Sequence, residues 1–158
     1  MFLRLLVDTM MREKKRDYAL YAVSLDHYYY VSKQSEEYRH MKEDPHNGHA
    51  GEDETSTVLA VAGEHVRMEH LDRNESHDDQ GRTAHLAGTA RCGFDWMGSY
   101  PNHYAGDGRF GTREKGEVLL DLLARRVAEI FRALRQDRAA ETLKAEYFAN
   151  AVHPPTRP

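Results

Sequence analysis

The longest regular pattern in the chain runs from Glu114 to Leu134, and it constrains the fold more than any other feature. Its apolar residues recur mostly at steps of three or four, which places them on one face of a helix: Leu119, Leu122, Leu123, Val127, Ile130, Phe131 and Leu134. The pattern predicts a long amphipathic helix whose apolar face has to pack against other elements. A shorter helix is expected at about Ala139–Ala149, followed by a disordered tail over residues 151–158.

The N-terminal part of the chain predicts a helix followed by a strand. Apolar residues between Met1 and Lys15 recur at mostly helical spacing with charges between them, as in an amphipathic helix. The segment Tyr18–Leu25 is short, apolar and bounded by charge, which is typical of a buried strand. A helix followed by a buried strand indicates an α/β fold with a mostly parallel sheet.

The residues directly after that predicted strand are candidates for a site, because ligands of open α/β sheets bind at the carboxyl ends of strands. They are Asp26, His27 and the three tyrosines Tyr28–Tyr30. Three tyrosines in a row are also ordinary packing residues. This segment alone therefore does not decide whether these residues bind a ligand or only pack within the fold.

Composition argues against several classes of protein. With 158 residues, the chain fits one domain. Its formal net charge of −4 argues against nucleic-acid binding, which usually requires a basic excess. No apolar stretch approaches the ~18 residues of a membrane span, so we expect no membrane partner. Cys92 is the only cysteine, which rules out an intrachain disulfide and fits a reducing cytoplasm.

The segment His46–Ser56 concentrates imidazole and carboxylate groups. It offers side chains of the kinds that bind Zn²⁺, Mn²⁺ or Fe²⁺, namely His46, His49, Glu52, Asp53 and Glu54. The alternative is a solvated polar loop in which Asp53 is the N-cap of a short helix, Glu54–Ala62. A catalytic zinc usually has three protein ligands and a water, so spacing alone favours the loop.

Two motifs resemble those of the creatininase (creatinine amidohydrolase) family. The first is HAGEDETS, His49–Ser56, before an apolar helix, and the second is GTREKGE, Gly111–Glu117, at the start of a long helix. The aromatic, glycine-rich segment Gly93–Thr112 between them fits as well. The resemblance covers nearly all of the chain, and the two motifs in this order make it specific.

The resemblance implies a three-layer α/β/α domain that hydrolyses cyclic amides or other non-peptide C–N bonds with a divalent metal, Zn²⁺, Mn²⁺ or Fe²⁺. It implies that Glu54 lies at the metal centre and that His49 is a catalytic acid or base. Glu52 and Asp53 match variable positions, so we expect both to be solvated. Further residues are expected to shape the pocket for a small amide substrate: Tyr28, Trp96, Tyr100, His103 and Asp107.

Most metal ligands of the family have no counterpart in this sequence. The family has an earlier Glu-x-His segment, an Asp shortly after it, and an Asn-Gly-His-Gly-Gly-Asn turn, and this set does not precede His49–Ser56 here. We therefore expect residues 1–150 to be the C-terminal portion of a creatininase-like domain, truncated at its N-terminus. The chain is then a fragment, one part of a split protein, or a domain that has lost catalysis, and of these we favour the fragment.

An incomplete site predicts negligible activity and weak metal binding by the isolated chain. It also predicts association, as a homo-oligomer or with a missing N-terminal half, since a truncated sheet leaves apolar faces uncovered. The alternative function is a non-catalytic interaction or assembly module. In that case the aromatic segments Tyr28–Tyr30 and Trp96–Tyr104 form a binding surface.

Overall fold

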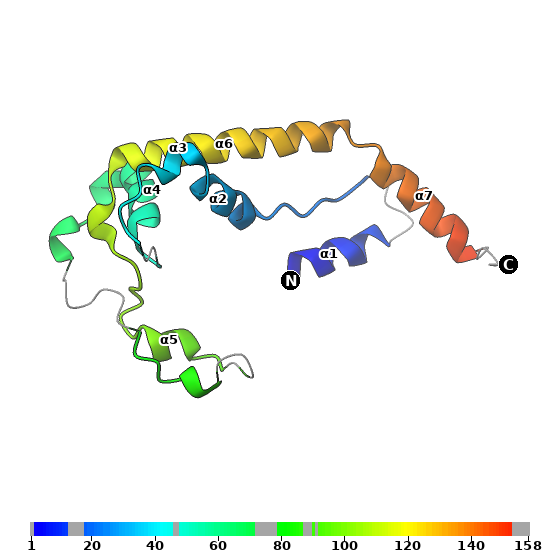
Figure 1. Cartoon of the computed structure of the whole chain (residues 1–158). Helices are drawn as coiled ribbons and strands as arrows, with labels where there is room; N and C mark the ends of the chain where they lie inside the picture. Colours follow the sequence, from blue (N-terminus) through cyan, green and yellow to red (C-terminus); the bar gives the residue numbers. More distant parts are fainter. Residues whose placement is uncertain are drawn as a thin grey trace. The chain divides into compact units, whose positions relative to one another are not determined.

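The computed structural model describes residues 2–12, 18–45, 48–71, 79–86, 90 and 92–152, and every regular element in them is a helix (Figure 1). The α-helices are α1 (Phe2–Met11), α2 (Leu25–Lys33), α3 (Glu36–Arg39), α4 (Glu52–Ala62), α5 (Asp95–Ser99), α6 (Arg113–Gln136) and α7 (Ala139–Val152). Short 3₁₀ turns are η1 (Gly63–His65), η2 (Met68–His70), η3 (Ala84–Leu86) and η4 (Gly108–Phe110). No strand occurs among these residues, so the predicted α/β/α fold with a mostly parallel sheet is wrong for this chain.

The segment that we predicted to be a buried strand, Tyr18–Leu25, is irregular until α2 begins at its last residue. A strand is stable only when a neighbouring strand satisfies its backbone N–H and C=O groups. No segment in the described part of the chain provides such a ladder, and the Tyr21 side chain is exposed instead of buried. Asp26 and His27 consequently lie in the first turn of α2, not at the carboxyl end of a strand.

Helices predicted from apolar spacing are confirmed at both ends of the chain. Helix α6 contains the predicted segment Glu114–Leu134, and α7 contains the predicted Ala139–Ala149. Helix α1 lies within the predicted N-terminal helix and ends at Met11. None of the helices in the described ranges has the length and apolarity needed to cross a membrane. The disordered tail was predicted to begin at residue 151, which is wrong because residues 151 and 152 belong to α7; from residue 153 onward the tail lies outside the described residues.

Helix α4 begins two residues earlier than the sequence predicted. Glu52 is its first residue, and Gly51 occupies the N-cap position without a side-chain hydrogen bond. Asp53 lies within the first turn, so the prediction that it caps this helix is wrong. Three consecutive carboxylates, Glu52, Asp53 and Glu54, stand in that turn, where the positive end of the helix dipole stabilises negative charge.

The chain divides into two units, which we describe separately. The first combines residues 1–27 with 127–158, and the second spans residues 28–126. The second unit has a small core of Tyr38, Leu119 and Leu122, against which Tyr29 and Val118 pack. Figure 1 shows α3 and α4 beside the N-terminal part of α6, which supplies both leucines.

Helices α4 and α6 approach each other closely at Gly116. A methyl group added there would lie 1.9 Å from the carbonyl oxygen of Ser56 and 2.9 Å from the Ala60 Cβ atom. Glycine avoids this overlap because it has no side chain. The Ser56 hydroxyl also accepts a hydrogen bond from the Thr112 N–H at 3.0 Å. These contacts fix the start of α6 against α4.

In the first unit, Tyr21 is joined to the start of α7. Its hydroxyl donates to Asp137, whose carboxylate accepts the N–H groups of Ala139 at 3.1 Å and Ala140 at 3.2 Å. This is the arrangement of a helix N-cap. The hydrogen bond from Tyr21 is the main reason that the pKa of Asp137 lies below its usual range, and the same bond raises the pKa of Tyr21.

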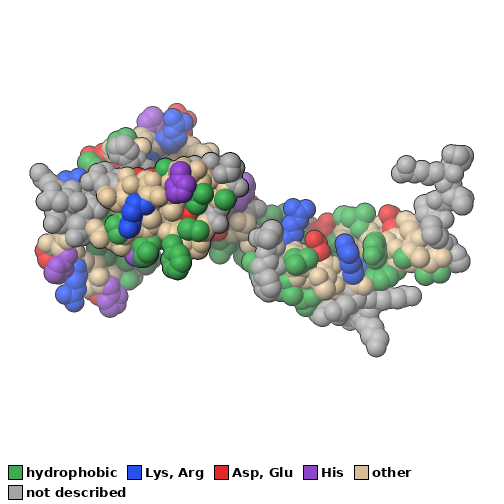
Figure 2. All heavy atoms as spheres, turned by 90° about the horizontal axis from the view of Figure 1, so that it is seen from below, with side chains coloured by type: hydrophobic (Ala, Val, Ile, Leu, Met, Phe, Trp, Pro, Cys, Tyr) green, Lys and Arg blue, Asp and Glu red, His purple; other side chains and the backbone are tan. Residues whose placement is uncertain are grey.

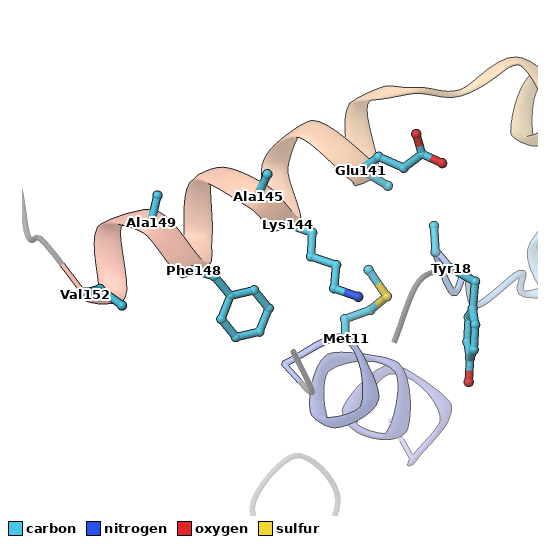
Figure 3. Close-up of a pocket in the computed structure, with 10 residues that line it drawn as sticks. Met11, Tyr18, Glu141, Lys144, Ala145, Phe148, Ala149 and Val152 are labelled. Atoms are coloured by element: carbon cyan, nitrogen blue, oxygen red, sulfur yellow. The ribbon is translucent and has the colours of Figure 1, made fainter. Parts of the chain in front are cut away.

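The first unit also contains a cavity of about 550 Å³ between α7, Met11 at the end of α1, and Tyr18. In Figure 3, the side chains of Met11, Lys144 and Phe148 point toward the same space. The described lining is mostly apolar and includes no histidine or cysteine. Glu141 and Lys144 are its charged lining residues.

Candidate functional site

The two sequence motifs meet in the second unit. HAGEDETS forms the loop before α4 and the first turns of that helix, and GTREKGE leads into α6. Lys115 of the second motif donates a hydrogen bond to Glu52 of the first at 2.5 Å, and both side chains are buried. This contact joins the starts of the two helices.

Glu52 is fully buried, so our expectation that it is solvated is wrong. Its carboxylate accepts hydrogen bonds from the backbone N–H groups of Glu43 at 3.1 Å and Asp44 at 2.8 Å. Lys115 also donates to the Glu43 carboxylate at 2.7 Å. Burial lowers the pKa of Lys115, but its hydrogen bonds to Glu43 and Glu52 outweigh burial, so the pKa is raised overall and the ammonium stays charged.

Asp53 is also fully buried, although we expected it to be solvated. Its carboxylate accepts the Tyr38 hydroxyl at 2.7 Å and pairs with Lys33 at 3.2 Å and Lys42 at 3.4 Å. Burial raises the pKa of Tyr38, and the hydrogen bond to Asp53 raises it further. Asp53 therefore ties α4 to α2 and to α3.

His49 and Glu54 form the part of the motif that faces solvent. Their side chains are 55% and 47% exposed, and His49 Nδ1 lies 3.0 Å from Glu54 Oε2. The same carboxylate oxygen accepts the Ala50 N–H at 2.8 Å. An ionised carboxylate only accepts hydrogen bonds, so a hydrogen bond across this contact requires the proton on Nδ1. In the neutral imidazole, Nε2 then carries the lone pair.

Backbone contacts hold His49 in place. Its carbonyl accepts hydrogen bonds from the N–H groups of Ala105 at 3.1 Å and Gly106 at 2.9 Å. The two segments touch closely here, since a methyl group on Gly48 would lie 2.1 Å from the Ala105 carbonyl oxygen. Ala50 has a φ of 57°, a left-handed conformation that is uncommon for a residue with a side chain. The loop around His49 is therefore fixed by its backbone.

An open depression of about 500 Å³ lies beside this pair, lined by Lys33, Gly48, His49, Glu54 and Trp96. The Trp96 ring meets the His49 ring edge-on, with centroids 5.7 Å apart. The Lys33 ammonium lies 4.9 Å from the centroid of the Tyr29 ring while it pairs with Asp53. The sequence did not single out Lys33, because one lysine at the end of a helix carries no signal of its own.

Two of the predicted pocket residues lie near His49. Tyr100 packs against Trp96 with ring centroids 4.8 Å apart. Both also line a neighbouring depression of about 640 Å³, together with Cys92 and Asp95. Trp96 therefore borders both depressions, whereas Tyr100 lines only the second.

Two other predicted pocket residues, His103 and Asp107, line neither depression. His103 is exposed, has a φ of 57° and lines neither depression. Asp107 is buried, its carboxylate binds the Arg109 guanidinium, and its N–H donates to Asp44 at 3.2 Å. Tyr28 belongs to α2, and its side chain lies outside the part that the structure describes.

The residues that the structure describes do not fit a divalent metal on their own. Among them, no three His, Cys, Asp or Glu side chains cluster in a way that could hold an ion. Figure 2 shows histidines spread over several places on the face in view. The Glu54 oxygen nearest His49 already accepts the Ala50 N–H and lies 3.0 Å from His49 Nδ1. His46, a possible ligand in the sequence, lies outside the described residues.

A histidine paired with a carboxylate beside an aromatic-lined depression is typical of sites for acid–base chemistry. Among protein families, the model described as Creatininase: Creatinine amidohydrolase matches residues 2–131. The match covers most of the chain, so the protein belongs to the creatininase family, and the prediction from the two motifs is confirmed. Comparisons with curated proteins and with solved structures give no significant match.

Proposed function

We propose that this chain supplies the proton-transferring side of a creatininase-type hydrolase, which cleaves a C–N bond in a cyclic amide or a similar small molecule. The observation that carries the proposal is the 3.0 Å contact between His49 Nδ1 and Glu54 Oε2 at the rim of an open depression. Membership of the creatininase family supports the class of reaction.

His49 performs the proton transfers that hydrolysis requires. Cleavage of an amide needs one proton removed from the attacking water and one delivered to the leaving nitrogen. With Nδ1–H bonded to Glu54, the Nε2 atom of His49 accepts the first proton and later donates it. Glu54 orients the ring and stabilises the imidazolium, as a carboxylate does in catalytic triads. Trp96, edge-on to His49, offers an apolar surface for a planar ring.

The family resemblance also implies a divalent metal, Zn²⁺, Mn²⁺ or Fe²⁺, but the described donors do not fit one alone. We therefore propose that the remaining ligands come from polypeptide outside this sequence, either an N-terminal half or another subunit. On this proposal, the isolated chain takes up metal weakly and has negligible activity.

The test is hydrolysis of a creatinine-type cyclic amide with added Mn²⁺ or Zn²⁺. The chain is assayed alone and mixed with a polypeptide that carries the Glu-x-His and Asn-Gly-His-Gly-Gly-Asn segments of the family. We expect no turnover by the chain alone and turnover by the mixture, lost in His49→Ala and kept in the control His103→Ala. His49-dependent turnover by the chain alone would disprove the need for outside ligands. Mixed activity that survives His49→Ala would disprove the role of His49.

A second candidate function is assembly without catalysis, and exposed apolar side chains favour it. Leu3, Leu5 and Leu6 of α1 are exposed, as are Leu143 and Tyr147 of α7. Figure 2 shows apolar side chains at the molecular surface. Uncovered apolar surface promotes association. Sedimentation at micromolar concentrations tests this candidate, and a monomer throughout would reject it.

A further inference from the structure

Lys115 connects, through Glu52, segments that surround His49. Its side chain is 6% exposed, and its ammonium donates to the Glu52 carboxylate at 2.5 Å and the Glu43 carboxylate at 2.7 Å. Glu52 in turn accepts the backbone N–H groups of Glu43 and Asp44. The position of residues 43 and 44 therefore depends on a carboxylate that Lys115 holds.

The contacts continue from Asp44 to the backbone of His49. The Asp44 carboxylate accepts the Asp107 N–H at 3.2 Å, and both residues are buried. The residues just before Asp107, Ala105 and Gly106, donate their N–H groups to the His49 carbonyl. A displacement of residues 43 and 44 is therefore transmitted to the peptide that positions His49.

We propose that Lys115 is a positioning residue for His49. By holding Glu52, it keeps residues 43–44 and 105–107 where the His49 ring meets Glu54. Lys115 and Glu52 are 63 residues apart in the chain, and each belongs to one of the two motifs. Their contact gives a physical reason why one motif carries a positive charge and the other a negative charge at these positions. The inference rests on the proposed role of His49, but its test needs no activity from the isolated chain.

Lys42 provides a matched control. Like Lys115, it pairs with a buried carboxylate in the first turn of α4, in this case Asp53 at 3.4 Å. When Lys42 is removed, Asp53 keeps its contacts with Lys33 and Tyr38. Those partners lie on α2 and α3, not in the loop that binds the His49 carbonyl. Loss of Lys42 therefore removes an ion pair without releasing His49.

The experiment uses the whole chain labelled with ¹⁵N. Nuclear magnetic resonance reads the tautomer of His49 from its ring nitrogens, and hydrogen exchange follows the Ala105 and Gly106 amides. In Lys115→Met we expect loss of the Nδ1–H form as the main neutral form and amide exchange faster by on the order of tenfold. In Lys42→Met we expect neither change.

Circular dichroism establishes that the compared variants keep their helices. If Lys115→Met does not fold, Glu52→Gln replaces it, because the amide keeps the volume of Glu52 but has one oxygen, so its NH₂ group faces either Lys115 or the backbone N–H groups of residues 43 and 44. An unchanged His49 tautomer in the folded variant, or an equal change in Lys42→Met, overturns the positioning role. A parent chain that lacks the Nδ1–H form overturns the His49–Glu54 pair of the proposed function, and the positioning role with it.

Discussion

Replacing Gly116 by alanine tests how closely α4 and α6 cross. The added carbon would lie 1.9 Å from the Ser56 carbonyl oxygen and 2.5 Å from its carbonyl carbon. Both atoms belong to the backbone of a helix, so no side-chain rotation relieves the overlap. The two helices have to separate locally by roughly 1.5 Å before the methyl group reaches an ordinary van der Waals distance.

Two opposing effects set the change in stability. Alanine inside a helix is favoured over glycine by about 1 kcal/mol. Overpacking costs about 1–3 kcal/mol, and each buried hydrogen bond that is lost costs about as much again. Separation of the helices lengthens the bonds from Thr112 to Ser56 and from Lys115 to Glu52, now 3.0 and 2.5 Å. We therefore expect Gly116→Ala to lower the free energy of unfolding by about 2–4 kcal/mol.

The assay is urea unfolding followed by the fluorescence of Trp96, the only tryptophan, which lies in the same unit. The midpoint falls while the slope stays unchanged if only stability is altered. Gly93→Ala is the matched control, because an added methyl group there meets no atom within 4 Å. Its effect should stay below about 1 kcal/mol. A Gly116→Ala variant as stable as the parent would refute the close crossing and the structural reason for this glycine.

Three further predictions concern buried and capping groups. Asp53→Ala leaves the buried Tyr38 hydroxyl and two partly buried lysines without their carboxylate and should cost about 2–4 kcal/mol of unfolding free energy in the same assay. The control is the exposed ion pair between Asp121 and Arg125, where Asp121→Ala should cost less than about 1 kcal/mol of unfolding free energy. Equal losses of stability in Asp53→Ala and Asp121→Ala would contradict the prediction. Tyr21→Phe removes the main cause of the lowered pKa of Asp137, so the titration midpoint of that carboxyl, read by nuclear magnetic resonance, should rise. A carboxyl whose pKa is lowered in the folded chain stabilises the fold above its unfolded-state pKa, and this stability is lost as the pH falls through the folded-state pKa. Tyr21→Phe removes part of that contribution, so the stability of the variant should fall less on acidification than that of the parent. An unmoved titration midpoint would count against the contact. Burial raises the pKa of Tyr29 to about 12, so Tyr29 should stay protonated in an ultraviolet titration up to about pH 11. The titration should therefore detect as many ionising tyrosines in Tyr29→Phe as in the parent. One ionising tyrosine fewer in the variant would show that Tyr29 is solvated.

The helices could be predicted because their determinants are local. Helical hydrogen bonds and the spacing of apolar side chains are set within a few residues, as in Glu114–Leu134. The prediction of a strand at Tyr18–Leu25 was wrong for the converse reason. A strand depends on a partner elsewhere in the chain, and a short apolar run does not show whether that partner exists.

The candidate site could be predicted only in part. The motif pointed to His49 and Glu54, which lie five positions apart where a loop enters a helix, and the structure brings their side chains together. Their catalytic role stays a prediction. The burial of Glu52 was missed because its partner, Lys115, is distant in sequence, and the spacing within one segment does not reveal such a partner.

Three consecutive carboxylates at the start of α4 reach three different surroundings, because successive helical residues are rotated by about 100°. Glu52 contacts α6, Asp53 contacts α2 and α3, and Glu54 borders the open depression. The first two are buried and hold the fold, whereas the third is half exposed. Selection can therefore act on them independently. A substitution at Glu54 changes the rim of the depression and leaves the contacts of Glu52 and Asp53 in place, so position 54 tolerates variation that the two buried positions do not.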